Sequence, residues 1–168
     1  MPNHCVNELI VSGSTDEKAR FLKMVGENLD FDRIIPYPEE FKKLDEAAEA
    51  FDKQEGIPYA NGRPKDGFNS GGYEWCVANW GTKWGSYNVE FSDGFYGTRF
   101  RFQTAWSPPI PVFRKLCEMV PLLGFELNYW ECGTERRGTL YRDQGDDDDT
   151  SAAEIVEECG RYVGGMCG

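Results

Sequence analysis

Short segments that alternate apolar and polar residues constrain the fold of this chain more than any other feature. Three of them lie at residues 87–91, 100–106 and 125–129. Because successive side chains of a strand point to opposite faces of a sheet, this period of two predicts strands with one buried and one solvated face. An apolar, β-branched segment from Cys5 to Val11 predicts another strand near the start of the chain. We therefore expect a sheet of four strands.

Two amphipathic helices are expected between these strands. The first follows a Ser-Thr pair suited to N-capping and has apolar residues at helical spacing in Phe21, Leu22 and Val25. The second begins after two prolines and has an apolar stripe formed by Val112, Phe113, Leu116, Cys117 and Val120. When the region between the first helix and the second strand is set aside, the predicted elements follow one another in the order βαββαβ. This order is the ferredoxin-like arrangement of the α+β class, an antiparallel sheet with both helices on one face.

The chain of 168 residues fits a single domain with two additions to this arrangement. The predicted core spans residues 4–30 and 86–131. An insert occupies residues 31–85, and a C-terminal extension occupies residues 132–168. Either addition is a candidate to cover the sheet face that the two helices leave open.

Local patterns in the insert predict helices and loops. Two prolines within residues 31–38 favour a loop or edge segment over a central strand. Residues 39–54 are rich in Ala, Glu, Lys and Leu, which predicts a surface helix. A second, short helix is expected from Tyr73 to a point near Gly81.

The C-terminal extension is polar and acidic. Polar residues between Gly133 and Gly145 suggest a hairpin. Residues 150–163 follow an acidic run, and carboxylates stabilise the N-terminus of a helix through the helix dipole. We therefore expect the extension to contain a helix.

The net charge of −11 limits the possible partners. It disfavours general nucleic-acid binding, which needs a basic surface to displace counterions, and it disfavours anionic membranes. From Tyr141 onward the chain has eight acids and two bases, a net charge of −6, whereas the remaining 21 acids and 16 bases give −5. The acidity either keeps the protein soluble or attracts a basic protein.

The tentative partner-binding residues are the acids of this last segment. Three hypotheses fit them: a solvated acidic loop, which we favour, a Ca²⁺ or Mg²⁺ site, and a phosphate-backbone mimic that occupies a basic groove. The run lacks the ligand spacing of an EF-hand. The residues are Asp146, Asp147, Asp148, Asp149, Glu154, Glu157 and Glu158.

Residues that commonly carry out catalysis are sparse. His4 is the only histidine, and its neighbour Cys5 is expected to point to the opposite face of the strand. None of the six cysteines forms a CxxC pair, which disfavours zinc and thioredoxin-type sites. Gly13 begins a strand-to-helix turn, but no phosphate-loop spacing accompanies it. We predict no catalytic, cofactor or metal site, while an enzyme using carboxylates such as Glu74 or Glu131 stays an alternative.

Aromatic and basic residues supply secondary candidates. Trp80, Lys83 and Trp84 suit either an aromatic clamp for a base or a sugar, or a packing cluster that seats the insert on the sheet. We favour packing, and we also expect Trp106 in the core.

Arg99 and Arg101 are expected on the face opposite the aromatic residues of their strand. There they suit contacts with phosphates in a nucleic-acid-binding module that uses the open sheet face. The interpretation we favour pairs them across strands with Glu90 and Glu126.

Three stretches of sequence resemble the YubB-type ferredoxin-like family, whose members are carried by bacterial phages, plasmids and integrated elements. They are MPNHCVNELIVSG, EWCVANWGTKW, and FQTAWSPPIPVFRKL followed by FELNYWECG. The resemblance spans most of residues 1–145, and its most specific parts are residues 79–84 and 104–109. It implies a ferredoxin-like sheet, a bacterial cytoplasm and a mobile-element origin. It implies neither an iron–sulfur cluster nor an active site.

The sequence thus predicts a non-enzymatic accessory protein of a phage or plasmid. Its expected partner is a basic host or defence protein, which makes inhibition of a host-defence system a candidate role. The N-terminus lacks the pattern of a signal peptide, and no apolar run approaches about 18 residues, so we expect a cytoplasmic protein without a membrane span.

Overall fold

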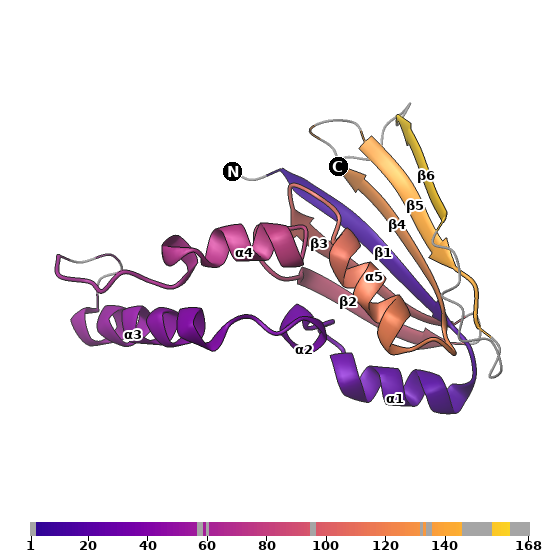
Figure 1. Cartoon of the computed structure of the whole chain (residues 1–168), viewed down its shortest axis with the longest axis horizontal. Coiled ribbons are helices and arrows are strands. Elements are labelled where there is room, and N and C mark those ends of the chain that lie inside the picture. The colour runs from indigo at the N-terminus through magenta and orange to yellow at the C-terminus, as the bar shows by residue number, and fades with distance from the viewer. Residues whose placement is uncertain are drawn as a thin grey trace.

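The computed structural model describes residues 3–56, 59, 61–94, 97–131, 133 and 136–145, and the backbone of residues 156–161. These residues form one six-stranded antiparallel sheet with the order β2-β3-β1-β4-β5-β6 (Figure 1). The first four strands in the chain have the order of a ferredoxin-like sheet, which confirms the predicted fold. The strands are β1 (His4–Ser12), β2 (Tyr87–Gly94), β3 (Gly97–Ala105), β4 (Gly124–Glu131), β5 (Arg136–Arg142) and β6 (Val156–Arg161).

Helices α1 (Thr15–Val25) and α5 (Ile110–Met119) pack on one face of the sheet. The Ser14 hydroxyl accepts a hydrogen bond from the backbone N–H of Glu17 at 3.3 Å and caps α1. Both predicted apolar stripes face the core, where Phe21 packs edge-to-face on Phe100 and Phe125. The side chains of β1 alternate accordingly, with Leu9 buried and its neighbours half-buried.

The opposite face of the central strands is more exposed, and we call it the open face. Along β3 it presents Arg99 and Arg101, which are exposed, and Gln103, which is half-buried. Along β1 it presents Glu8 between two half-buried aliphatic side chains. Alternation along β1 and β3 therefore separates a packed face from a polar one, as the period of two predicts.

The insert forms an arm that projects from the sheet (Figure 1). It contains α2 (Phe31–Ile34), α3 (Glu39–Glu55), the short 3₁₀ helix η1 (Phe68–Ser70) and α4 (Gly72–Asn79). The helices predicted at 39–54 and from Tyr73 are confirmed. The segment predicted as a loop instead begins with α2, because the Asp30 carboxylate accepts from the backbone N–H of Asp32 at 3.0 Å and caps a single helical turn.

The prediction of a helix over residues 150–163 is wrong for the part that the structure describes. Residues 156–161 form β6, an edge strand paired with β5 from Tyr141↔Val156 to Arg136↔Arg161. The open edge of β5 supplies backbone partners along the whole segment, and this long-range pairing outweighs the local helix preference. The hairpin expected between Gly133 and Gly145 is also wrong, because residues 136–142 form one strand, β5, between β4 and β6.

Candidate functional site

Four side chains form an aromatic–lysine surface beside the C-terminal end of β3: Tyr73, Lys83, Trp84 and Trp106. The Lys83 ammonium lies 4.8 Å from the ring centroid of Trp106, 5.1 Å from that of Trp84 and 5.8 Å from that of Tyr73. These distances are within the range of cation–π attraction. The residues come from α4, from the loop before β2 and from the segment after β3, so the fold assembles the surface from three parts of the chain.

A rigid backbone frame holds this surface. Gly81 has a φ of +76°, and a Cβ there would lie 2.6 Å from Cδ of Pro111, so the close approach of the two segments requires glycine. The Ser107 hydroxyl donates to the carbonyl of Gly81 at 2.5 Å. The hydroxyl of the buried Thr82 donates to the carbonyl of Trp84. The loop that carries Lys83 and Trp84 is therefore fastened to the segment that carries Trp106.

Trp106 combines exposure with an unfavourable backbone conformation. Its side chain is 46% exposed, and its φ is +71°. A bulky residue at positive φ is strained, and such strain persists where the surrounding structure imposes it. Here the backbone N–H of Trp106 donates to the carbonyl of Asn3 at 2.8 Å and fixes the turn. The expectation of a core position for Trp106 is therefore wrong.

Trp80 belongs to the core and not to this surface. It is 7% exposed, and its indole N–H donates to the carbonyl of Ile35 at 2.9 Å. Its ring packs against those of Phe31, Tyr37 and Trp75. The clamp of Trp80, Lys83 and Trp84 considered from the sequence does not form. Trp80 packs the insert onto the core, whereas Lys83 and Trp84 lie at the surface.

His4 and Tyr87 continue the aromatic–lysine surface toward the open face. His4 Nδ1 lies 2.6 Å from the Tyr87 hydroxyl, which also donates to the carbonyl of Thr104 at 3.3 Å. The rings of Trp84 and Tyr87 are 6.4 Å apart. Burial, and secondarily the nearby Cys5, raises the pKa of Tyr87.

Cys5 does not form a nucleophilic pair with His4. The Cys5 thiol is fully buried and contacts Asn7, and burial raises its pKa to about 12. The thiols of Cys76 and Cys117 are also buried, and burial raises the pKa of each to about 11. A thiol must ionise to act as a nucleophile, so these three are unsuited to that role. The side chains of the other three cysteines lie outside the described residues.

Arg99 and Arg101 lie on the open face, as predicted, and of the two expected acids Glu90 lies on the neighbouring strand whereas Glu126 does not. Arg99 Nη1 lies 3.4 Å from Glu8 Oε1 across the β1–β3 pair. Arg101 is opposite Glu90 in the β2–β3 register. Glu126 instead accepts a hydrogen bond from the Asn128 amide at 2.7 Å. Each pairing is set by which strand lies next to β3, and β4 is separated from β3 by β1.

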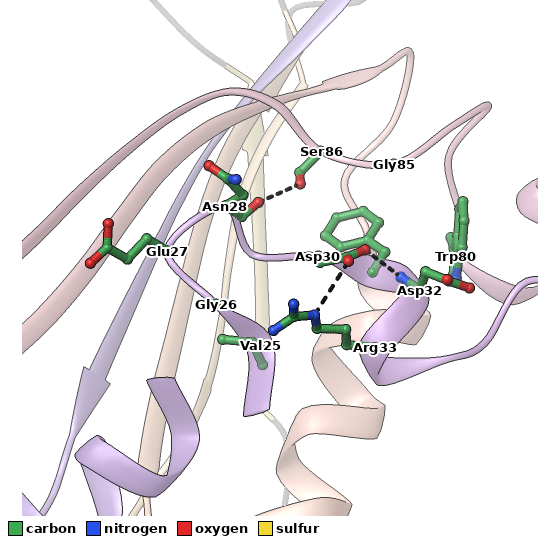
Figure 2. Close-up of a pocket in the computed structure, with 11 residues that line it drawn as sticks. Val25, Gly26, Glu27, Asn28, Asp30, Asp32, Arg33, Trp80, Gly85 and Ser86 are labelled. Carbon is green, nitrogen blue, oxygen red and sulfur yellow. Dashed lines mark hydrogen bonds and ion pairs between the residues drawn. The ribbon is translucent and has the colours of Figure 1, made fainter. Parts of the chain in front are cut away.

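A pocket of about 620 Å³ opens between the end of α1, α2 and the loop before β2 (Figure 2). Three of its charged side chains are paired: Arg33 Nε lies 3.5 Å from Asp30 Oδ2 within the lining, and Asp32 lies 2.7 Å from Lys42, which is outside it. Glu27 points away from the others in Figure 2. The pocket therefore lacks a convergent set of polar groups that would select one class of ligand.

The acidic residues considered as a tentative partner-binding surface lie largely outside the described residues. This holds for Asp146, Asp147, Asp148, Asp149 and Glu154, whereas Glu157 and Glu158 are described only by their backbone in β6. In the sequence the acidic run lies between β5 and β6, and β6 is the strand at one edge of the sheet.

The described residues contain no group of three or more His, Cys, Asp or Glu side chains suited to a metal ion. Glu74 is exposed on α4, whereas Glu131 is buried at the end of β4 and accepts from the backbone N–H of Gly133 at 2.8 Å. Of the helices in the described part of the chain, none is both long and apolar enough to cross a membrane.

Comparison with known proteins supports the fold. Residues 79–161 match the model of a family described as a ferredoxin-like domain in Api92-like protein. The crystal structure of protein api92 from Yersinia pseudotuberculosis is similar to this chain, with a TM-score of 0.57 and 12% sequence identity over 99% of this chain and 100% of that one. Likeness at this identity shows the fold alone. A search of curated proteins gives no match.

Proposed function

We propose that this protein is a non-enzymatic binding protein that docks on a basic protein partner through its acidic C-terminal segment. The observation that supports the proposal is that the acidic run follows β5 and precedes β6 in the sequence, outside the strands and helices of the ferredoxin-like core. A change of charge there leaves the core packing intact. Binding and folding are then separable properties of the chain.

Electrostatics supports a basic partner. Eight acids and two bases from Tyr141 onward give the segment a net charge of −6 within about a sixth of the chain. Complementary charge accelerates encounter and selects partners, and it does so most strongly at low salt. Four consecutive aspartates approximate the charge spacing of a phosphate backbone, which suits a groove that normally holds nucleic acid.

The biological setting belongs to the same proposal. The resemblance to YubB-type proteins supports a phage or plasmid origin and action in the cytoplasm of a bacterial host. In this proposal the basic partner is a host-defence protein. By occupying the groove in which that partner normally holds nucleic acid, the acidic segment inhibits it. The proposal involves no covalent chemistry, which agrees with the burial of Cys5, Cys76 and Cys117.

A pull-down from bacterial lysate with a charge-matched control tests the proposal. The test variant changes Asp146 to Asp149 to Asn. The control changes four exposed acids of α3 to Gln: Glu40, Glu46, Glu49 and Glu55. Both variants remove the same net charge, so a position-specific contact is lost only in the first. Equal partner recovery with both variants, at low and at raised salt, would refute the acidic-segment proposal.

A further inference from the structure

We propose that the aromatic–lysine surface binds a nucleotide unit, a base together with its phosphate, supplied either by single-stranded nucleic acid or by a free nucleotide. This activity goes beyond the proposed protein binding and uses the opposite edge of the sheet. It rests on the environment of Lys83, on the strained and exposed Trp106, and on the way the surface continues onto β3.

Lys83 is a cation among aromatic rings. Among the described residues no carboxylate lies within ion-pair distance of its ammonium. By contrast, Arg63 is held by Asp52 and Asp66 at 2.9 and 2.7 Å. Ring faces attract the ammonium without neutralising its charge, and they exclude part of its water. An approaching phosphate therefore meets a positioned cation that no acid of the described chain competes for.

Trp106 supplies the surface for a base. Its indole is half exposed beside Lys83, and the bonds from Ser107 to Gly81 and from Trp106 to Asn3 hold it in place before any ligand arrives. Bases stack on such rings regardless of sequence, since every base has a π-face. A ring that is already fixed loses little conformational entropy on binding.

The surface continues in the direction that a bound strand would follow. From Trp84 it passes to Tyr87, which lies opposite Gln103 in the β2–β3 register. Arg101 and Arg99 then follow on the same face of β3, two residues apart. Beyond one base on Trp106 and one phosphate on Lys83, the surface thus leads to Arg101 and Arg99, which lie opposite Glu90 and beside Glu8.

The edge strand β6 lies far from β3 in the sheet. Four strand spacings of about 4.8 Å separate β3 from β6, or about 19 Å in all. The Debye length at physiological salt is about 8 Å. Charge at β6 is therefore largely screened from β3.

Fluorescence anisotropy with a labelled oligothymidylate of about ten nucleotides tests this proposal. We expect Trp106→Ala to weaken binding about ten-fold or more through loss of stacking, while Trp106→Phe, which keeps a ring, retains most of the affinity. Lys83→Gln should weaken binding and lower the slope of log affinity against log salt by about 0.7. Met119→Ala and Lys115→Gln, both exposed on α5, serve as matched controls and should bind like the wild type.

Competition identifies the source of the nucleotide. Displacement by thymidine monophosphate but not by thymidine shows that the phosphate is read, and a large advantage of the oligonucleotide over the monophosphate assigns the site to single strands. Absence of binding by the wild type at low salt, or equal binding by wild type, Trp106→Ala and Lys83→Gln, overturns the proposal. If the acidic-segment variant recovers the partner as well as the wild type does, the expected oligonucleotide binding at the aromatic–lysine surface is unchanged. Each of the two proposals can therefore be refuted without the other.

Discussion

At the scale of single residues, Trp106 is notable because it is partly exposed and has a positive φ, which residues other than glycine disfavour. A φ of +71° is accessible to glycine without strain and costs other residues about 1 kcal/mol or more. Nearly half of its side chain is nonetheless exposed. This combination is expected where a residue serves binding and not stability.

The strain at Trp106 predicts an unusual order of stability. Trp106→Gly should be more stable than Trp106→Ala by about 1 kcal/mol, because only glycine relaxes at this φ. Urea unfolding of the two variants measures the difference. The opposite order would show that position 106 is not held in the left-handed conformation.

Arg142 is the residue whose loss should most disturb the packing of β5. It is 5% exposed, and its guanidinium donates to the carbonyls of Cys117 and Pro121 and, at 3.1 Å, to that of Leu123. Arg142→Met leaves these carbonyls without a donor and should lower the free energy of unfolding by about 2–4 kcal/mol. Arg114→Met, at an exposed position on α5, is the control and should change it by less than about 0.5 kcal/mol. A small effect at both positions in denaturant unfolding would contradict this role.

At the scale of elements, one ion-pair cluster ties α3 of the arm to the segment before η1. Arg63 bridges Asp52 on α3 and Asp66 just before η1, and Asp66 also accepts from Asn69. Burial alone would raise the pKa of Asp66, but the hydrogen bonds from Arg63 and Asn69 outweigh it and lower the pKa below its ordinary value of 3.8. The cluster thus stabilises the arm only while Asp66 is ionised.

This depressed pKa gives the stability of the arm a defined pH dependence. The contribution of Asp66 is fully present well above pH 3.8 and is lost as the pH falls through its lower, folded-state pKa. Thermal melts between about pH 6 and pH 2.5 should therefore show a smaller acid-induced loss for Asp66→Asn than for the wild type. At pH 6 the variant should be the less stable of the two. Identical pH profiles for the two proteins would show that ionised Asp66 does not stabilise the arm. The variant Glu46→Gln is the control for removing an exposed acid.

Local sequence predicts elements well where the period is clear and poorly where long-range pairing decides. Strands β1, β3 and β4 alternate cleanly because one of their faces is buried. Strand β6 follows an acidic run that favours a helix, and only the available edge of β5 makes it a strand. The sequence of residues 156–161 alone does not indicate that an unpaired edge of β5 is available.

The candidate surface was partly predictable for a related reason. Trp80 and Trp84 have the spacing of one helical face, yet α4 ends at Asn79 and the positive φ of Gly81 turns the chain. The two rings therefore separate, one into the core and one to the surface. That Trp106 would join Lys83 depends on the contact between residues 81 and 107, which lie far apart in the sequence.

At the scale of the whole molecule, the two proposals concern opposite edges of the sheet. The aromatic–lysine surface lies at the β2–β3 edge, and the acidic run lies in the sequence between β5 and β6, which form the other edge. The ferredoxin-like core lies between them and its packing involves neither.

The most direct test of the proposed function uses the partner protein recovered in the pull-down. Isothermal titration calorimetry measures its affinity for the wild type and for the two charge variants. We predict that Asp146 to Asp149 changed to Asn weakens binding about ten-fold or more, because several complementary charges are lost together. The variant with Glu40, Glu46, Glu49 and Glu55 changed to Gln should bind like the wild type at the same salt. Equal affinities for the two variants would contradict a contact through the acidic segment.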